Sequence, residues 1–161
     1  MLQCFHSLRN REEPLKKRGK QAIGRSRGGL TTKIHMVTAS DRSAVSFSLS
    51  DGANHDSSEG MKLLFFTTAC SNGQSLLMDR AYEGDKMRAA AKELGYNPVV
   101  PPKKNRVEPW AYDRELYKRR NEVERFFRRL KRFRRIFTRY DKLDIVFAGF
   151  ILFAMIFDSL V

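Results

Sequence analysis

The sequence predicts an α/β domain in which a mixed sheet packs against helices. Residues 31–38 and 44–50 alternate apolar with polar side chains, which is the period of half-buried strands. Short apolar runs at 75–79 and 97–100 enclose a helical stretch that Gly95 ends. A strand–helix–strand rhythm of this kind is typical of a sheet with helices on its faces.

Two helices are expected after Asp113. The first is long and basic and extends to about Tyr140. The second is the apolar segment Ile145–Phe157, which contains no charged residue. As a helix this segment would be about 20 Å long, whereas the hydrocarbon core of a membrane is roughly 30 Å thick. We therefore predict a buried core helix and no membrane span.

The composition favours a nucleic-acid partner. Lys and Arg number 31 against 18 Asp and Glu, which gives a net charge of +13. Such a surface attracts polyanions, among them nucleic acid and acidic membrane surfaces. Two isolated cysteines and the lack of a signal-peptide pattern indicate a reducing, cytoplasmic setting.

The first 23 residues are predicted to form a basic arm, disordered or extended, ahead of a domain at 24–161. Residues 9–29 are rich in Lys, Arg and Gly and show no sustained apolar period. Within the arm, Leu2–Leu8 could form a short strand.

The segment 116–140 has a clear helical pattern. At roughly 100° per residue, one stripe is apolar and should face the core. Four polar residues share a narrow arc beside this stripe, and an i±4 pair of Glu124 with Arg120 or Arg128 would explain the acid without any function. The core stripe comprises Leu116, Val123, Phe126, Phe127, Leu130, Phe133 and Phe137. The arc beside it comprises Tyr117, Arg120, Glu124 and Lys131. The face expected to be solvated comprises Arg125, Arg128, Arg132 and Arg139.

The spacing Tyr117-x2-Arg120-x3-Glu124-x6-Lys131 resembles the Y-R-E-K signature of bacterial insertion-sequence DDE transposases of the IS-four/IS-five group. Two further blocks resemble this family in the same order, Gly24–His35 (GRSRGGLTTKIH) and Leu76–Asp85 (LLMDRAYEGD). The sequences PPKKNR at 101–106 and RYDK at 139–142 also resemble family segments.

The resemblance implies an RNase H-like fold (ribonuclease H/retroviral integrase-like) and DNA transposition by metal-dependent phosphodiester cleavage and strand transfer. Asp79 would be the second catalytic carboxylate and Glu124 the third. Both would bind Mg²⁺ (or Mn²⁺), because these hard cations prefer oxygen ligands. Tyr117, Arg120 and Lys131 would grip the phosphates of the transposon ends.

Other basic residues lie on loops near these blocks. Arg25 and Arg27 are predicted phosphate contacts, with a solvated loop as the equal alternative, and Lys103 and Lys104 are expected to contact DNA. Trp110 is interpreted as a core anchor in preference to a base-stacking residue. The expected partners are DNA and a second copy of the chain, or the product of an upstream reading frame, in a nucleoid-associated complex.

The sequence departs from the family at the first carboxylate. An Asp is expected on a strand ahead of the GRSRGG block, but the first Asp of the chain is Asp41, and the earlier acids are Glu12 and Glu13 beside Pro14. We therefore expect the first strand of the fold to be missing or replaced. The chain is predicted to be a partial, N-terminally truncated transposase, or one frame of a split one, that does not cut DNA alone. The alternatives are a non-catalytic DNA-binding protein that uses the basic helix, and a membrane-associated protein.

Overall fold

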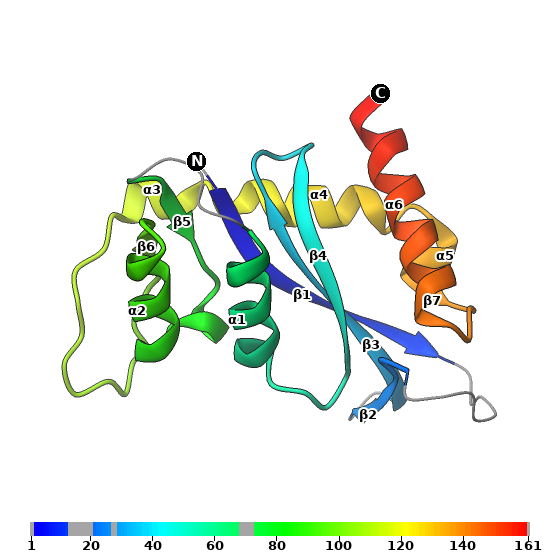
Figure 1. Cartoon of the computed structure of the whole chain (residues 1–161), viewed down its shortest axis with the longest axis horizontal. Coiled ribbons are helices and arrows are strands. Elements are labelled where there is room, and N and C mark those ends of the chain that lie inside the picture. Colours follow the sequence, from blue (N-terminus) through cyan, green and yellow to red (C-terminus); the bar gives the residue numbers. More distant parts are fainter. Residues whose placement is uncertain (1, 13–20, 27–28, 68–72, 161) are drawn as a thin grey trace.

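The chain forms a mixed sheet with helices on both faces (Figure 1). The computed structural model describes the backbone of residues 2–12, and residues 21–26, 29–67 and 73–160 in full. The strands are β1 (Leu2–Glu12), β2 (Gly24–Ser26), β3 (Gly29–Thr38), β4 (Ala44–Asp51), β5 (Ser75–Leu77), β6 (Asn97–Val99) and β7 (Thr138–Arg139). The helices are α1 (Asp56–Phe66), the 3₁₀ turn η1 (Arg80–Tyr82), α2 (Asp85–Glu93), α3 (Arg114–Lys118), α4 (Asn121–Leu130), α5 (Arg134–Phe137) and α6 (Asp144–Leu160).

Strand β1 lies in the middle of the sheet. It pairs antiparallel with β3 on one side and parallel with β5 on the other, and the main order is β4-β3-β1-β5-β6. The short strands β2 and β7 pair with β3 and β1, respectively. Of the two expectations for the first strand, a missing strand is therefore wrong, because Leu2–Glu12 takes the central place. Residues 2–12 of the segment that was predicted to be an arm therefore belong to the sheet.

Strand β3 supplies side chains to two cores, because successive residues of a strand point to opposite faces. Ile34 and Met36 are buried in a core with α4 and α6, whereas Val37 is buried in a second core with α1 and α2. Figure 1 shows α1 and α2 on one side of the strands and α4 on the other. The predicted strands and the helix before Gly95 are confirmed. The expectation that the strand at 31–38 is half-buried is wrong, because helices cover both of its faces.

The long basic helix predicted from Asp113 to about Tyr140 is wrong in its continuity. Asp113 begins it as expected, since its carboxylate accepts a 2.9 Å hydrogen bond from the Leu116 amide. At Arg119–Arg120 the backbone angles stay helical but the amides bond to carbonyls three residues earlier, which interrupts the α-helical hydrogen bonds, and α4 ends at Leu130. Phe133 is extended, with φ −78° and ψ 110°, so the residues after it no longer follow the α4 faces.

This break explains two wrong predictions of side-chain exposure. Phe137 was expected in the core but is 59% exposed, and Ile136 is buried in its stead. Arg139 was expected on the solvated face but is only 2% exposed, because it lies in β7 beside the end of β1. The core stripe holds within α4 itself, where Val123, Phe126, Phe127 and Leu130 are all buried.

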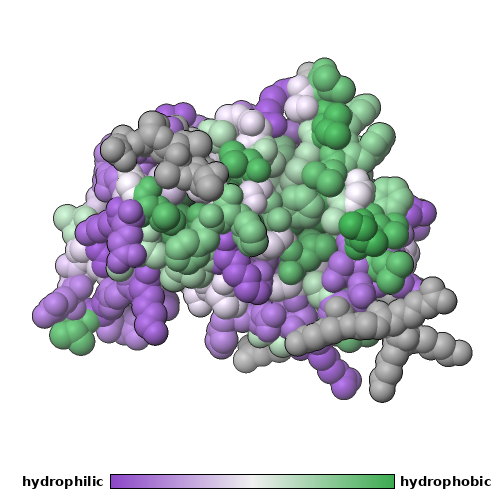
Figure 2. Space-filling model, viewed as in Figure 1, coloured by the Kyte–Doolittle hydropathy of each residue, from purple (hydrophilic) through white to green (hydrophobic). Residues whose placement is uncertain are grey.

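Helix α6 is only partly the buried core helix that its composition predicted. Phe147, Ile151 and Ala154 form its buried stripe at helical spacing. Its other faces leave large apolar side chains exposed, and Figure 2 shows apolar surface gathered over this helix. Within the described ranges, no helix has both the length and the apolarity required to cross a membrane.

Gly60, in the middle of α1, tests the packing between α1 and η1. A Cβ atom at Gly60 would lie 2.5 Å from Cδ1 of the buried Tyr82 ring. We expect Gly60→Ala to lower the free energy of unfolding by roughly 1–3 kcal/mol, as overpacking does, in urea denaturation.

Gly149 in α6 provides the matched control, because an added Cβ there meets nothing within 4 Å. Gly149→Ala should leave stability unchanged or raise it by up to about 1 kcal/mol, since Ala favours a helix over Gly. Equal effects of the two substitutions would show that the Tyr82 ring can move away.

Candidate functional site

Asp79 lies just past the end of β5, which pairs in parallel with β1 and β6. Its carbonyl accepts a 2.8 Å hydrogen bond from the Tyr82 amide, which starts the 3₁₀ turn η1. Met78, just before it, is fully buried and bonds to β6 through its amide, whereas the Asp79 side chain is 34% exposed. A carboxylate is therefore presented to solvent at the carboxyl end of a sheet strand, where ligands commonly bind in open α/β sheets.

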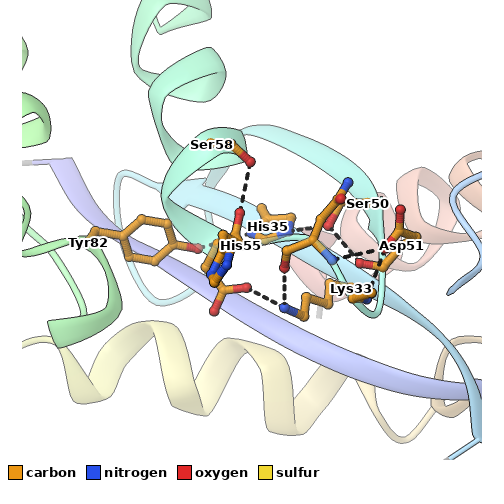
Figure 3. A network of polar contacts seen from close by, with 10 residues as sticks. Lys33, His35, Ser50, Asp51, His55, Ser58 and Tyr82 are labelled. Atoms are coloured by element: carbon orange, nitrogen blue, oxygen red, sulfur yellow. Dashed lines mark hydrogen bonds and ion pairs between the residues drawn. The ribbon is translucent and has the colours of Figure 1, made fainter. Parts of the chain in front are cut away.

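A row of hydrogen-bonded polar side chains, Tyr82, His35 and Ser50, holds the turn after Asp79 in place (Figure 3). The Tyr82 hydroxyl lies 3.0 Å from Nδ1 of His35, and Nε2 of His35 lies 2.8 Å from Oγ of Ser50. Tyr82 and His35 are 1% and 0% exposed. The Gly24–His35 block and the Leu76–Asp85 block thus meet through the hydrogen bond between His35 and Tyr82.

Lys33 lies on β3, two residues before His35, near these hydrogen-bonded side chains (Figure 3). Its Nζ donates to the carbonyl of Asn54 at 2.6 Å and to the Asp56 carboxylate at 2.8 Å. Asp51 accepts from the amides of Ala53 and Asn54, both at 2.9 Å, and shapes the turn that leads to α1. Asp51 therefore forms this turn, whereas Asp56 does not cap α1 and is the partner of the buried Lys33 cation.

Asp79 and Glu124 lie against the same guanidinium group. Nη2 of Arg120 donates to Oε1 of Glu124 at 2.6 Å, and Nη1 of Arg120 lies 3.9 Å from Oδ2 of Asp79. The side chains of Asp79 and Glu124 are about one-third exposed, and that of Arg120 is 18% exposed. The structure thus brings a strand end and a helix, 45 residues apart in sequence, to one cationic group.

Arg120 is placed by a tightened turn between α3 and α4. The amides of Arg119 and Arg120 bond to carbonyls three residues earlier, at 3.1 and 3.0 Å. Turns of this type inside a helical run frequently mark functional positions. The guanidinium carbon also lies 5.6 Å from the centre of the Tyr117 ring, which packs edge-on against Tyr112.

Lys131, the fourth residue of the predicted arc, lies on the same side of the helix but far from the other three. It lies one residue past the end of α4 and is exposed. Seven residues of helix separate it from Glu124, which is about 10 Å along the axis. Tyr117, Arg120 and Glu124 are therefore neighbours, and Lys131 extends the same side of the helix.

The other predicted DNA contacts lie on separate parts of the surface. Arg25 is exposed in β2, and Lys104 is exposed on the loop after β6. Lys103 lies 3.3 Å from the buried carboxylate of Glu83. Arg27 falls outside the described residues.

The loop after β6 is tied to the turn that carries Asp79. Arg106 approaches Glu83 at 3.5 Å and also bonds to Asp85, and this bond holds the pKa of the Asp85 carboxyl below its ordinary value. Trp110 donates to the carbonyl of Val100 at 2.9 Å, and the Arg88 guanidinium lies 3.5 Å from its ring centre. These contacts agree with the interpretation of Trp110 as an anchor.

A third carboxylate does not join Asp79 and Glu124 in the part of the chain that the structure describes, where no group of three potential metal ligands is found. On β1, the neighbours of Leu76 and Leu77 are Leu2 and Gln3, and no residue from there to Arg11 is acidic. Glu12 pairs with Leu30 and Arg139 at the opposite end of β1, about 30 Å away at 3.3 Å per residue. The register of β1 therefore places no acid beside Asp79.

Sequence reasoning missed the role of Arg139 in the RYDK block. Its guanidinium donates to Oγ1 of Thr32 at 2.8 Å and to Asp144 at 2.7 Å, and it stacks on Phe147. Asp144 also accepts from the amide of Ala22. Arg139 thus joins the segment before β2, strand β3 and the start of α6. The only sequence signal for this role was the RYDK block itself, since the helical pattern placed Arg139 on a solvated face.

Comparison with known proteins assigns the chain to a family. Residues 6–157 match the family model described as a transposase DDE domain, and the chain belongs to this family. It is 30% identical over 123 residues to a protein of Brucella ovis named "Putative transposase for insertion sequence element IS6501", covering 76% of this chain and 92% of that relative. No solved structure matches the chain. The chain is thus an insertion-sequence DDE transposase by family. Members of this family act in DNA transposition, bind DNA at transposon ends and use divalent metal ions.

The free energy of unfolding should depend on pH through His35, which hydrogen-bonds to Tyr82 in the turn after Asp79. Burial lowers the pKa of His35 from 6.5 to about 4, although Asp56 and Glu59 oppose this shift. Between these two values the unfolded chain binds a proton that the folded chain excludes. The free energy of unfolding should therefore rise with pH across this window, by up to about 3 kcal/mol.

Urea denaturation at pH 4.5, 5.5 and 6.5 measures this dependence. His35→Gln should reduce the slope, whereas His55→Gln, at an exposed position, should leave it unchanged. Identical slopes for wild type and His35→Gln would contradict the assignment.

Proposed function

We propose that this chain is the DNA-acting domain of an insertion-sequence transposase and that Asp79 and Glu124 hold a divalent cation, Mg²⁺ or Mn²⁺. The observation that carries the proposal is the convergence of both carboxylates on one cationic group, Arg120. Two carboxylates that are about one-third exposed and already share the Arg120 guanidinium have the oxygen donors and the access to solvent that a hard divalent ion requires. They supply two ligands of such a site.

The sheet order is the support for an RNase H-like fold, which we propose as the architecture. A central first strand has an antiparallel meander, β3 and β4, on one side and the parallel strands β5 and β6 on the other. Asp79 then follows the strand next to the central one, and Glu124 comes from a helix that packs on one face of the sheet.

In the proposed mechanism, the residues of the site bind the divalent cation, bind phosphate or hold another residue in position. A divalent cation at such a site activates the attacking oxygen and stabilises the leaving oxygen of a phosphodiester. Asp79 and Glu124 would hold it, and His35 and Tyr82 keep the turn of Asp79 in place. Arg120 has the planar fork that matches a phosphate, and Lys131 would act as a point charge further along the helix.

Phosphates further along the DNA would meet residues on other parts of the chain. We propose Tyr117, Arg25, Arg27, Lys103 and Lys104 as further DNA contacts. A second copy of the chain, or the product of an upstream frame, stays the predicted protein partner.

The chain alone is proposed not to cut DNA. The support is the register of β1, which brings Leu2 and Gln3 beside β5 and no acid near Asp79. Two carboxylates leave the cation with fewer anionic ligands than the three of the family pattern, so its charge and position are less well controlled.

Manganese binding tests the two proposed ligands. Asp79→Asn and Glu124→Gln should each weaken Mn²⁺ binding by about tenfold, a loss of roughly 1.4 kcal/mol, in a paramagnetic-resonance titration. Glu122→Gln is the matched control, since Glu122 lies on the same helix and pairs with Arg119. Equal Mn²⁺ affinity in all four proteins would overturn the assignment.

A cleavage assay tests the proposed inactivity. Duplex DNA that carries the terminal inverted repeats flanking the coding region should stay intact with the purified chain and Mg²⁺ or Mn²⁺. Robust metal-dependent cleavage that Glu124→Gln abolishes would show that the chain completes its own site.

A non-catalytic DNA-binding protein is the second candidate, favoured by the incomplete carboxylate set. Both candidates predict DNA binding that weakens steeply with salt, because phosphate contacts release counterions. They differ in the divalent ion: a purely binding protein would show DNA affinity and Mn²⁺ affinity that are both indifferent to Asp79→Asn and Glu124→Gln.

A further inference from the structure

Arg120 occupies the position between the two proposed cation ligands. Its guanidinium bonds to one Glu124 oxygen at 2.6 Å and lies 3.9 Å from one Asp79 oxygen. An arginine is always charged in a protein, so both carboxylates already have a counter-charge in the free chain. This counter-charge belongs to the chain itself and is never diluted away.

The position of Arg120 is also built into the backbone. The tightened turn at Arg119–Arg120 sets where the side chain leaves the helix, and the Tyr117 ring lies beside the guanidinium. The guanidinium is more covered than either carboxylate, at 18% exposure against 34% and 31%. A divalent ion that approaches from solvent therefore reaches carboxylates whose inner oxygens face an arginine.

We propose that Arg120 is an intramolecular competitor of the divalent cation and that a DNA phosphate releases it. This inference rests on the proposed function of Asp79 and Glu124. A phosphate offers the guanidinium a bidentate anionic partner. When Arg120 turns to the phosphate, both carboxylates lose their internal counter-charge and gain affinity for the ion. DNA and the divalent ion then raise each other's affinity, because such coupling is reciprocal.

The first test removes the competitor and measures Mn²⁺ binding to the chain without DNA. Arg120→Met should bind Mn²⁺ on the order of tenfold more tightly than wild type, within the range of coupling between sites. Arg119→Met is the matched control, since Arg119 lies in the same turn but pairs with Glu122, and it should bind Mn²⁺ like wild type. The gain should disappear in the double variant Arg120→Met, Glu124→Gln.

A second variant keeps the test decisive if Arg120→Met fails to fold, as judged by circular dichroism. Arg120→Lys retains the positive charge and should keep Mn²⁺ affinity within about twofold of wild type, but it loses the planar fork that binds phosphate. The affinity for a fluorescent DNA duplex of arbitrary sequence should rise with Mn²⁺ at constant ionic strength in wild type, and rise less in Arg120→Lys.

The outcomes separate this inference from the proposed function. If Asp79→Asn and Glu124→Gln weaken Mn²⁺ binding but Arg120→Met leaves it unchanged or weakens it, the competitor role is overturned and the cation site stands. An equal Mn²⁺-dependent rise in DNA affinity for wild type and Arg120→Lys overturns the release by phosphate. If neither carboxylate substitution affects Mn²⁺ binding, the proposed function itself fails.

Discussion

The alternation of side chains along β3 is the constraint on which the two layers of helices depend. Ile34 and Met36 enter the core of α4 and α6, while His35 and Val37 enter the core of α1 and the Asp79 turn. A slip of one residue would exchange these faces and put a histidine among the phenylalanines of α4. The antiparallel pairing with β1 and β4, which runs along most of β3, fixes the register against such a slip. Strand β3 thus contacts the turn after Asp79 on one face, through His35, and packs against the helix that carries Glu124 on the other.

Local sequence pattern was sufficient where one period runs through a whole element. The strands at 31–38 and 44–50 were predicted from their alternation and the stripe of α4 from its helical spacing, although the first of these strands is buried on both faces. The pattern failed where tertiary contacts decide the course of the chain. The basic run after Leu130 has good helical propensity, but Thr138 and Arg139 pair with β1 instead, and nothing local encodes that pairing. The apolar α6 misled in a different way, because composition shows that a helix is apolar and does not show how many of its faces find a partner.

The candidate site was likewise predictable where local sequence motifs define it, and not where tertiary contacts do. Asp79, Tyr117, Arg120 and Glu124 could be named from fixed spacing, since a motif records residues that act together regardless of the path between them. The i±4 pair of Arg120 with Glu124 was also predicted from the helix, but the approach of Arg120 to Asp79 could not be, because Asp79 lies at the end of a distant strand. The support of the turn by His35 needed the fold as well, since sequence alone gives no distance between the two blocks that it joins.

A net charge of +13 overstates the surface that is open to DNA, because the basic residues serve two different purposes. Lys33 and Arg139 are almost fully buried, each with an acidic partner, and contribute to folding. Exposed cations such as Lys104 and Lys131 can meet phosphates without giving up an internal partner of this kind. Arg120 stands between the two classes, mostly covered but beside carboxylates that solvent reaches. A cation of this intermediate kind can exchange one anionic partner for another at small cost, whereas a buried one would leave an uncompensated charge. For DNA binding at this site, the number of basic residues therefore matters less than which of them can exchange a carboxylate partner for a phosphate.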